Sequence, residues 1–195
     1  MGKEGYTEDF TNDAKDRIFN AFVSLMKEKT PSSISVKELC SLAGVSRMTY
    51  YRHYTSFEDI IVDHLSHTPI GFNPDLQPED FDPAEHSRLS FQYFYDERAL
   101  MECIVDGEYQ HVFIDFCNNY FHTQFKDVAR SLGFTEPYDL SALAGMYIFT
   151  IMDWVRNGYD LPVEEMAKYG VIIFKRASFG IKETQLKAML RDILK

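Results

Sequence analysis

Long apolar runs and paired cysteines are both missing from this 195-residue chain. No stretch approaches the roughly 18 consecutive apolar residues of a membrane-spanning helix. The N-terminal residues MGKEGYTEDF contain no apolar segment of the kind found in secretion signals. The three cysteines, Cys40, Cys103 and Cys117, form no C-x-x-C pair. They are typical of free buried thiols, so we expect a protein of the reducing cytoplasm.

Catalytic motifs are also missing. The sequence contains no G-x-S-x-G, no P-loop, no H-E-x-x-H and no dinucleotide fingerprint. His111, Asp115 and His122 would share one helical stripe, but at 1.5 Å per residue His122 lies about 16 Å beyond His111, too far to share an ion. A solvated face is the favoured interpretation. We therefore expect no enzyme activity, no metal and no cofactor other than a small-molecule effector.

Positive charge is in short supply, since the formal net charge is -10 at pH 7. Such a balance argues against non-specific binding of nucleic acid. The charge is unevenly spread, however: residues 1–66 hold 8 Lys and Arg against 10 Asp and Glu, whereas residues 67–195 hold 12 against 20. A small basic surface in the first part could still contact DNA if the acidic bulk faces away.

Apolar and aromatic residues are plentiful: 45% of the chain is hydrophobic, with 16 Phe and 12 Tyr. Their spacing is helical nearly throughout, so the sequence predicts an all-α protein with a sizeable core. The expected helices cover 13–28, a short segment after Ser35, about 47–54, about 56–66, 84–106 with a break around 96–99, 108–131, 140–157, 163–179 and 183–194.

Proline marks the expected domain boundary. Pro69, Pro74, Pro78 and Pro83 interrupt an acidic segment, which indicates a linker or loop. We expect an N-terminal three-helix helix-turn-helix domain in residues 1–66, the linker in 67–83, and a helical C-terminal domain in 84–195.

The segment SVKELCSLAGVSRMTYYRHY, from Ser35 to Tyr54, has the local features of a helix-turn-helix. Ser35 and Glu38 form a capping box, Gly44 suits a turn that needs positive φ, and Ser46 can cap the next helix. Cys40 is the small residue that lets two helices cross closely, so packing is a better explanation for it than reactivity. Leu39, Ala43, Val45 and Tyr50 complete the expected packing set.

The second helix of this motif would expose Arg47, Met48, Tyr51 and Arg52. Arginine can bind a guanine edge in the major groove, and Tyr51 and His53 can contact phosphate. Ser35, Lys37 and Thr49 are placed to hold the DNA backbone. The alternative interpretation is the solvated face of an ordinary three-helix unit.

The sequence SVKELCSLAGVSRMTYYRHYTSFEDII resembles the DNA-binding domain of the TetR family of transcriptional regulators. The shared features are the A-G-V-S turn, the run containing Thr49, Tyr50, Tyr51, His53 and Tyr54, and the acidic start of the next helix, over residues of about 13–66. The resemblance implies base-edge contacts from Arg47 and Met48, and phosphate contacts from Lys37, Thr49, Tyr51 and His53, with Arg52 on either. With Ser35 and Ser46 these are our predicted DNA-binding residues. Tyr50 and Tyr54 would be core.

Phe57 departs from the family pattern, because many relatives carry a phosphate-binding lysine there. We expect Phe57 to pack with Ile60, Ile61, His64 and Leu65 instead. Each DNA half-site would then lack one ionic contact, and the salt dependence of binding would be shallower.

In the family, the C-terminal helices form an effector pocket and a dimer interface. Aromatic residues supply walls for such a pocket, although aromatic stripes are more often plain core. Our candidates for the effector pocket are Phe94, Phe113, Phe116, Tyr120, Tyr147 and Trp154. The segment 140–154 contains the small residues Ala142, Ala144 and Gly145, and with 171–174 it suits a two-fold interface or, equally, an internal core helix.

The sequence thus predicts a homodimeric transcriptional regulator that binds a pseudo-palindromic DNA site. Repression relieved by a small-molecule effector is the expected mode. The alternative is a dimeric co-regulator or interaction protein whose helix-turn-helix serves mainly as a scaffold. Its support is the uncharged Phe57 and the acidic balance of residues 1–66.

Overall fold

The computed structural model describes residues 4–67, 77–136 and 138–178, with backbone alone for 4–12 and 176–178. Within these ranges the chain forms ten α-helices and two short 3₁₀ helices and contains no strand, which confirms the predicted all-α class. The expected helix at 183–194 and most of the expected linker lie outside the described residues.

Contacts group the chain into two compact units, residues 1–69 with 96–116, and residues 70–95 with 117–195. The first unit therefore includes residues 96–116 in addition to the predicted N-terminal domain. The predicted domain boundaries, after residue 66 and after residue 83, remain predictions. We describe each unit by itself.

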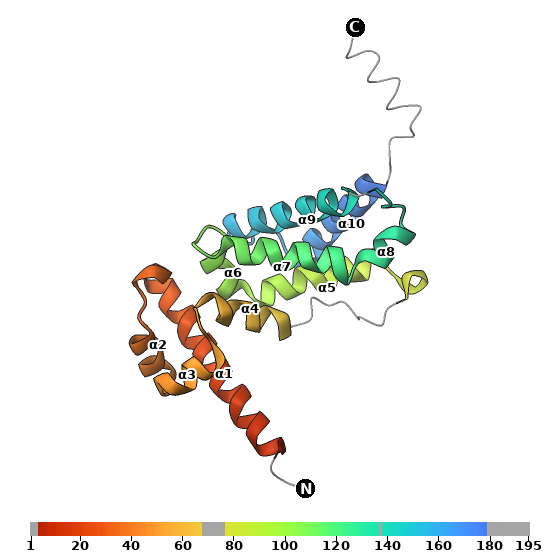
Figure 1. Cartoon of the computed structure of the whole chain (residues 1–195). Coiled ribbons are helices and arrows are strands. Elements are labelled where there is room, and N and C mark those ends of the chain that lie inside the picture. The colour runs from red at the N-terminus through yellow and green to blue at the C-terminus, as the bar shows by residue number, and fades with distance from the viewer. Residues whose placement is uncertain (1–3, 68–76, 137, 179–195) are drawn as a thin grey trace, which may run out of the picture. The chain divides into compact units, whose positions relative to one another are not determined.

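The first unit is built around α1 (Glu4–Glu28), which Figure 1 shows in red alongside α2 (Val36–Ala43) and α3 (Arg47–His53). α4 (Glu58–His67) and α6 (Arg98–Ile104) also pack on α1. The core holds the apolar stripe of α1, including Ile18 and Phe22, which are fully buried. This is the amphipathic pattern expected for the first helix.

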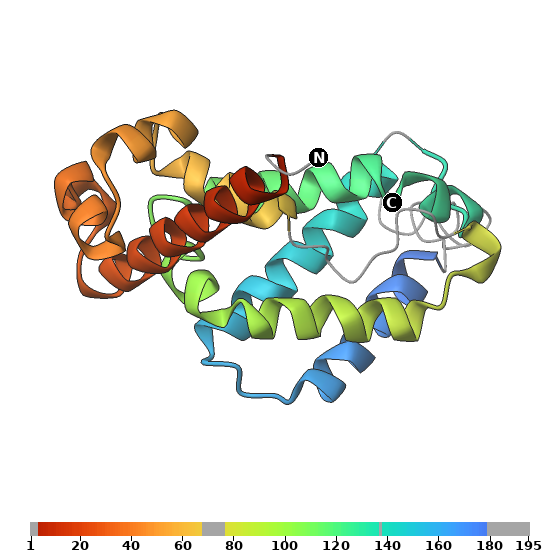
Figure 2. The same ribbon diagram turned by 90° about the horizontal axis from the view of Figure 1, so that it is seen from below.

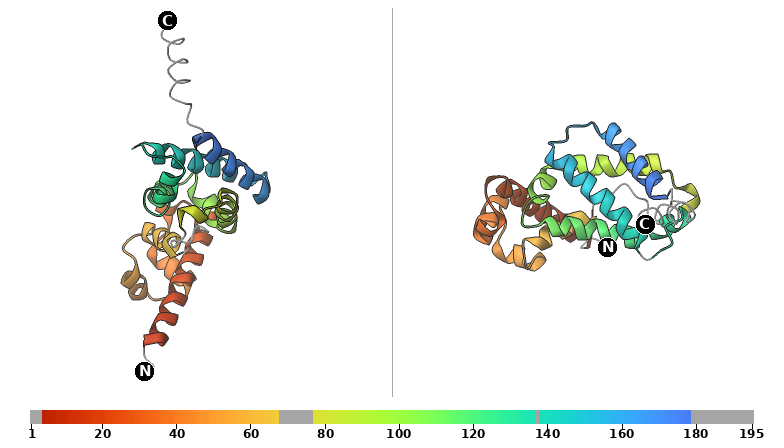
Figure 3. Two further views of the ribbon diagram at one scale, coloured as in Figure 1. Left: turned by 90° about the vertical axis from the view of Figure 1, so that its right-hand side faces the viewer. Right: turned by 90° about the horizontal axis from the view of Figure 1, so that it is seen from above.

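The second unit contains α5 (Pro83–Asp96, all but its last residue), α8 (Lys126–Ser131), α9 (Asp139–Arg156) and α10 (Val163–Ser178). α9 and α10 are joined by a short loop and run in opposite directions (Figures 2 and 3). The loop follows a turn at Gly158, whose φ is +66°. The predicted break after Asp96 is confirmed, because α5 ends there and α6 begins at Arg98.

One predicted helix is wrong. Instead of a single helix over 108–131, the chain forms α7 (Gln110–Thr123) and α8, with a break at Gln124 and Phe125. The backbone amide of Phe125 donates to the carbonyl of Tyr120, five residues back. The Phe125 ring is fully buried against His86, Tyr120 and Phe121. Burial of this ring in the second unit outweighs the continuation of a regular helix.

Gly170 sets how closely α10 approaches its neighbours. A Cβ atom at this position would come within 1.8 Å of Ser87 Oγ and 2.8 Å of the Tyr147 hydroxyl. Ser87 lies on α5 and Tyr147 on α9. The missing side chain therefore lets three helices meet around Ser87, whose hydroxyl donates to the carbonyl of Ala167 at 2.8 Å.

Candidate nucleic-acid interface and ligand cavity

The turn between α2 and α3 has the predicted geometry. Gly44 ends α2 with φ +65° in the left-handed region, and the amide of Val45 donates to the carbonyl of Cys40 at 3.0 Å. Leu39, Cys40 and Ala43 are buried. Burial raises the pKa of the Cys40 thiol, so this cysteine is a packing residue, as expected.

Both helices of the motif begin at serine caps. Ser35 Oγ accepts from the amide of Glu38 at 3.2 Å, and Ser46 Oγ accepts from the amide of Thr49 at 3.0 Å. These bonds satisfy amide groups that lack helical partners. The Glu38 carboxylate, expected to reach back to Ser35, instead accepts a bond from Lys29. The hydroxyls of Ser46 and Thr49 lie 2.9 Å apart.

α3 presents an exposed face with the predicted side chains. Met48 is 76% exposed and Tyr51 61%, while Arg47 and Arg52 are also exposed. Lys37 and Ser35 are exposed at the start of α2, whereas Thr49 and His53 are half-buried. Leu42, 56% exposed on α2, was not among the predicted residues. The predicted DNA-binding set thus lies on and around the first turns of α2 and along α3.

The cations of this face are available to an anion. Among the described residues, no ion pair involves Lys37, Arg47 or Arg52. His53 differs, because burial, with the nearby charges of Lys15 and Arg52, lowers its pKa. Its ring is therefore neutral at pH 7 and offers one N–H donor, so the positive charge of the face comes from arginine and lysine.

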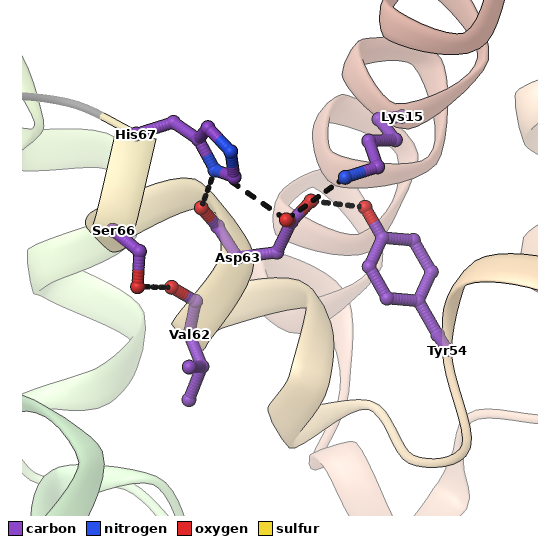
Figure 4. A network of polar contacts seen from close by, with 6 residues as sticks. All are labelled: Lys15, Tyr54, Val62, Asp63, Ser66 and His67. Carbon is purple, nitrogen blue, oxygen red and sulfur yellow. Dashed lines mark hydrogen bonds and ion pairs between the residues drawn. The ribbon is translucent and has the colours of Figure 1, made fainter.

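Asp63 on α4 fixes the C-terminal end of α3 (Figure 4). One carboxylate oxygen accepts from the Tyr54 hydroxyl at 2.8 Å, and the other from Lys15 Nζ at 2.9 Å. Tyr54 is the C-cap of α3, and Lys15 belongs to α1. His67 lies on the same carboxylate at 3.4 Å. One side chain thereby joins α1, α3 and α4.

Electrostatics favour the ionised form of Asp63. Burial by itself would raise the pKa of its carboxyl, but the hydrogen bonds from Lys15 and Tyr54 outweigh burial and lower it. Burial and the bond to Asp63 raise the pKa of Tyr54, so its hydroxyl stays a donor.

Packing is confirmed for Phe57, but its ring partners, Phe22 and Tyr50, were not among the residues predicted to join it. It is half-buried, and its ring centroid lies 5.1 Å from that of Phe22 and 6.2 Å from that of Tyr50. Tyr50 and Tyr54 are 1% and 3% exposed, which confirms them as core. Phe57 immediately precedes α4, and its ring packs against core rings where a lysine would extend toward solvent.

A small cavity of about 10 Å³ lies inside the second unit. It is lined from α5, α7 and α9. The lining residues are His86, Ser90, Phe94, Cys117, Tyr120, Phe121, Tyr147, Ile148 and Ile151.

The polar stripe of α7, which was interpreted as a solvated face, includes His111 and His122, and each of them contacts a polar group. His111 Nε2 lies 3.2 Å from a carboxylate oxygen of Glu58, and His122 Nε2 lies 3.3 Å from Ser141 Oγ. Among the described residues, no group of three His, Cys, Asp or Glu side chains could hold a metal ion. Nor is any described helix long and apolar enough to span a membrane.

The architecture is similar to that of several solved structures. No protein-family model matches the sequence, and no curated protein matches it. A solved structure from Syntrophomonas wolfei, assigned to the TetR family of transcriptional regulators, matches with a TM-score of 0.67 at 16% identity, over 88% of this chain and 98% of that one. A TetR transcriptional regulator from Streptococcus agalactiae matches with a TM-score of 0.59 at 21% identity, over 88% and 99%. The chain has the TetR-type regulator fold.

A further match is the dihydroxyacetone kinase operon activator DhaS, with a TM-score of 0.59 at 15% identity over 84% of this chain and 94% of that one. The three proteins are named as regulators of transcription. They show the TetR-type fold of this chain.

Within this TetR-type fold, half of the predicted pocket residues line the cavity. Phe94, Tyr120 and Tyr147 do so. Phe113 and Phe116 fall in the first unit. Trp154 packs against Phe91 and Tyr159, and its Nε1 donates to the carbonyl of Leu161.

Sequence reasoning missed His86 and Ser90 as cavity residues. They precede Phe94 by eight and four residues on α5, so all three lie on one helical face. The sequence could have indicated this, because His86 and Ser90 are spaced four residues apart, and Ser90 stands four residues before Phe94. Burial lowers the pKa of His86 to about 4, which makes this ring neutral at pH 7.

The tyrosines of α3 allow a paired test of the Asp63 contact. We expect Tyr54→Phe to lower the free energy of unfolding by about 2 kcal/mol, because it removes a hydrogen bond to a partly buried carboxylate. Tyr51→Phe, at an exposed site, should change stability by less than about 0.5 kcal/mol. Urea unfolding of both variants measures the difference. Equal stability of the two would contradict the role of Asp63.

The buried His86 should make stability depend on pH. Its pKa is depressed in the fold, so between pH 6.5 and about 4 the unfolded chain binds a proton that the folded chain does not. As pH falls through this window, His86 should therefore remove up to about 3 kcal/mol of stability. Unfolding curves of wild type and His86→Phe should diverge accordingly, with His122→Phe as the exposed control. Parallel pH profiles of wild type and His86→Phe would contradict the burial argument.

Proposed function

We propose that the protein is a sequence-specific DNA-binding regulator of transcription. The exposed face of α3, with its unpaired Arg47 and Arg52 beside Met48 and Tyr51, is the observation that carries this proposal. A helix with such a face fits the major groove, where arginine can bind guanine and Met48 can contact a thymine methyl group. In this proposal the N-termini of α2 and α3, capped by Ser35 and Ser46, would bind DNA phosphates.

The distribution of charge supports DNA binding by the surface of α2 and α3. The acidic balance of the chain disfavours non-specific adsorption, while three exposed cations, Lys37, Arg47 and Arg52, lie on α2 and α3. Phosphate contacts position such a protein, and base-edge contacts give specificity. The packed Phe57 removes one candidate phosphate contact, so we propose a shallower dependence of affinity on salt than a lysine there would give.

We further propose that the regulator is a cytoplasmic homodimer on a pseudo-palindromic site. α9 buries Ala144 and Tyr147, yet its outer face exposes Ala142, Met146 and Phe149. A Cβ atom at Gly145 would meet nothing within 4 Å, so another helix can approach there. Tyr169 and Ile172 extend the apolar surface along α10. An isologous contact of this face would join two protomers, so that the dimer carries two α3 helices for the two halves of the DNA site.

In this proposal, an effector in the cavity of the second unit controls DNA binding, with release of repression as the expected mode. Ligands act by favouring one of two populated conformations. A co-regulator that never binds DNA remains the alternative, supported by the uncharged Phe57.

The proposed reader is tested with DNA selected by the wild-type protein from a random library. Arg47→Ala should weaken binding to the selected site by about 1–3 kcal/mol and relax specificity at one base pair, and Tyr51→Phe should weaken it less. Arg88→Ala, an exposed arginine of α5, is the matched control and should bind normally. Fluorescence anisotropy measures all four proteins. If the wild type selects no sequence at low salt, the co-regulator is the better account.

The dimer is tested by placing a charge on the exposed face of α9. Phe149→Glu should raise the dimer dissociation constant at least tenfold, since two buried carboxylates would face each other across the two-fold axis. Asn119→Glu adds the same charge to an exposed position of α7 and should leave assembly unchanged. Sedimentation velocity over a concentration series distinguishes the two. A Phe149→Glu protein that associates like wild type would place the interface elsewhere.

A further inference from the structure

The cavity of the second unit has one hydrogen-bonding group to spare. Ser90 is 2% exposed and lines the cavity. Its Oγ is close enough to the Tyr147 hydroxyl to affect the pKa of that group, yet it forms no well-oriented hydrogen bond within the described structure. A buried hydroxyl without a partner costs free energy. The neighbouring Tyr147 hydroxyl donates to Ser87 Oγ at 3.2 Å, and Ser87 donates onward to Ala167. Ser90 is therefore placed to bind a ligand.

The walls of the cavity carry no formal charge. None of the nine lining residues is Asp, Glu, Lys or Arg, and His86 is neutral at pH 7 because burial depresses its pKa. A charged ligand would lose its hydration without gaining an ionic partner, which is strongly unfavourable. An uncharged ligand meets no such penalty.

The composition of the lining favours an aromatic ring. Phe94, Tyr120, Phe121 and Tyr147 supply four aromatic side chains, and Ile148 and Ile151 add apolar surface from α9. Aromatic rings pack well in edge-to-face and offset arrangements. At about 10 Å³ the open space holds no more than one water molecule. A ring must therefore displace lining side chains as it binds, which limits the ligand to a small one.

We propose that this cavity binds an uncharged single-ring or fused-ring aromatic molecule that carries one hydroxyl or N–H group, with Ser90 Oγ as its hydrogen-bond partner. The inference rests on the proposed function in taking the cavity as the effector site. It adds the chemical class of the effector and the residue that selects its polar group.

Displacement of the lining offers a route for control. Cys117 on α7 lines the cavity and is buried. The same helix begins at Gln110, in the unit that carries α3. A ring that pushes on the second half of α7 also acts on its first half, because a helix transmits displacement as a rigid element. In this proposal α7 is the element through which a bound ring would act on the unit that carries α3.

The test uses the full-length protein and four probes of similar size: benzyl alcohol, toluene, benzoate and benzylammonium. At pH 7.5, calorimetry should detect saturable binding of the two neutral molecules, with benzyl alcohol the tighter. The two ions should bind at least tenfold more weakly. Thermal unfolding with each probe gives a second measurement, since a ligand of the folded state raises the melting temperature.

Ser90→Ala tests the assigned hydrogen bond. Because Ser90 Oγ is unsatisfied, this variant should be as stable as wild type or more so. It should bind benzyl alcohol about five- to tenfold more weakly and toluene with unchanged affinity. Toluene is the matched control, since it fills the same space without a hydroxyl group.

Three outcomes would overturn the proposal: benzoate binding as tightly as benzyl alcohol, Ser90→Ala weakening both neutral probes equally, or no saturable binding of any probe. DNA binding is measured separately on the selected site. Intact DNA binding with no probe bound refutes this inference alone, and probe binding with no DNA bound refutes the proposed function alone.

Discussion

The carboxylate of Asp63 is the contact around which the first unit is organised. α3 is only seven residues long, too short to hold its own orientation, since isolated helices of that length are not stable in water. Its start is set by the turn at Gly44 and the cap at Ser46, and its end by the bond from Tyr54 to Asp63. Because Lys15 of α1 binds the same carboxylate, α1 holds the end of α3 and the Asp63 side chain of α4 in place.

The two units differ in the partners of their buried polar groups. In the first unit, half-buried polar groups contact one another: Asp63 accepts from Lys15 and Tyr54, and His64 Nε2 lies 2.9 Å from a carboxylate oxygen of Glu97. In the second unit, neutral groups lie among aromatic rings, and His86 stacks on Phe125. Hydrogen bonds to a carboxylate fix the geometry of the first unit, whereas a neutral aromatic core can rearrange around a neutral guest at lower cost.

Local features of this fold could be predicted from the sequence, because they depend on residues three or four positions apart. The caps at Ser35 and Ser46, the left-handed Gly44 and the break after Asp96 are of this kind. Features that depend on distant residues could not be predicted. Phe125 ends α7 because its ring is buried against His86, 39 positions earlier, and Lys15 meets Asp63 across 48 positions.

The candidate site divides in the same way. The exposed residues of α3 could be named because Met48 and Tyr51 are turned away from the buried Tyr50 on a helix, and Arg47 stands at the exposed first position of α3. The cavity required tertiary information. Phe94 and Phe113 are equally apolar in sequence, yet only Phe94 lines it, because Phe113 packs in the other unit. Hydrophobic pattern identifies the core but not which part of the core is hollow.

The absent side chain at Gly170 has a consequence for how this sequence can evolve. Every other amino acid adds at least a Cβ atom, and that atom would collide with the hydroxyl oxygen of Ser87. A first substitution at position 170 is therefore selected against unless Ser87 changes first. Even then the Tyr147 hydroxyl and the Phe91 ring remain within 3.0 Å of the new atom. We expect substitutions in α10 to accumulate at exposed positions such as Lys168, while Gly170 stays unchanged.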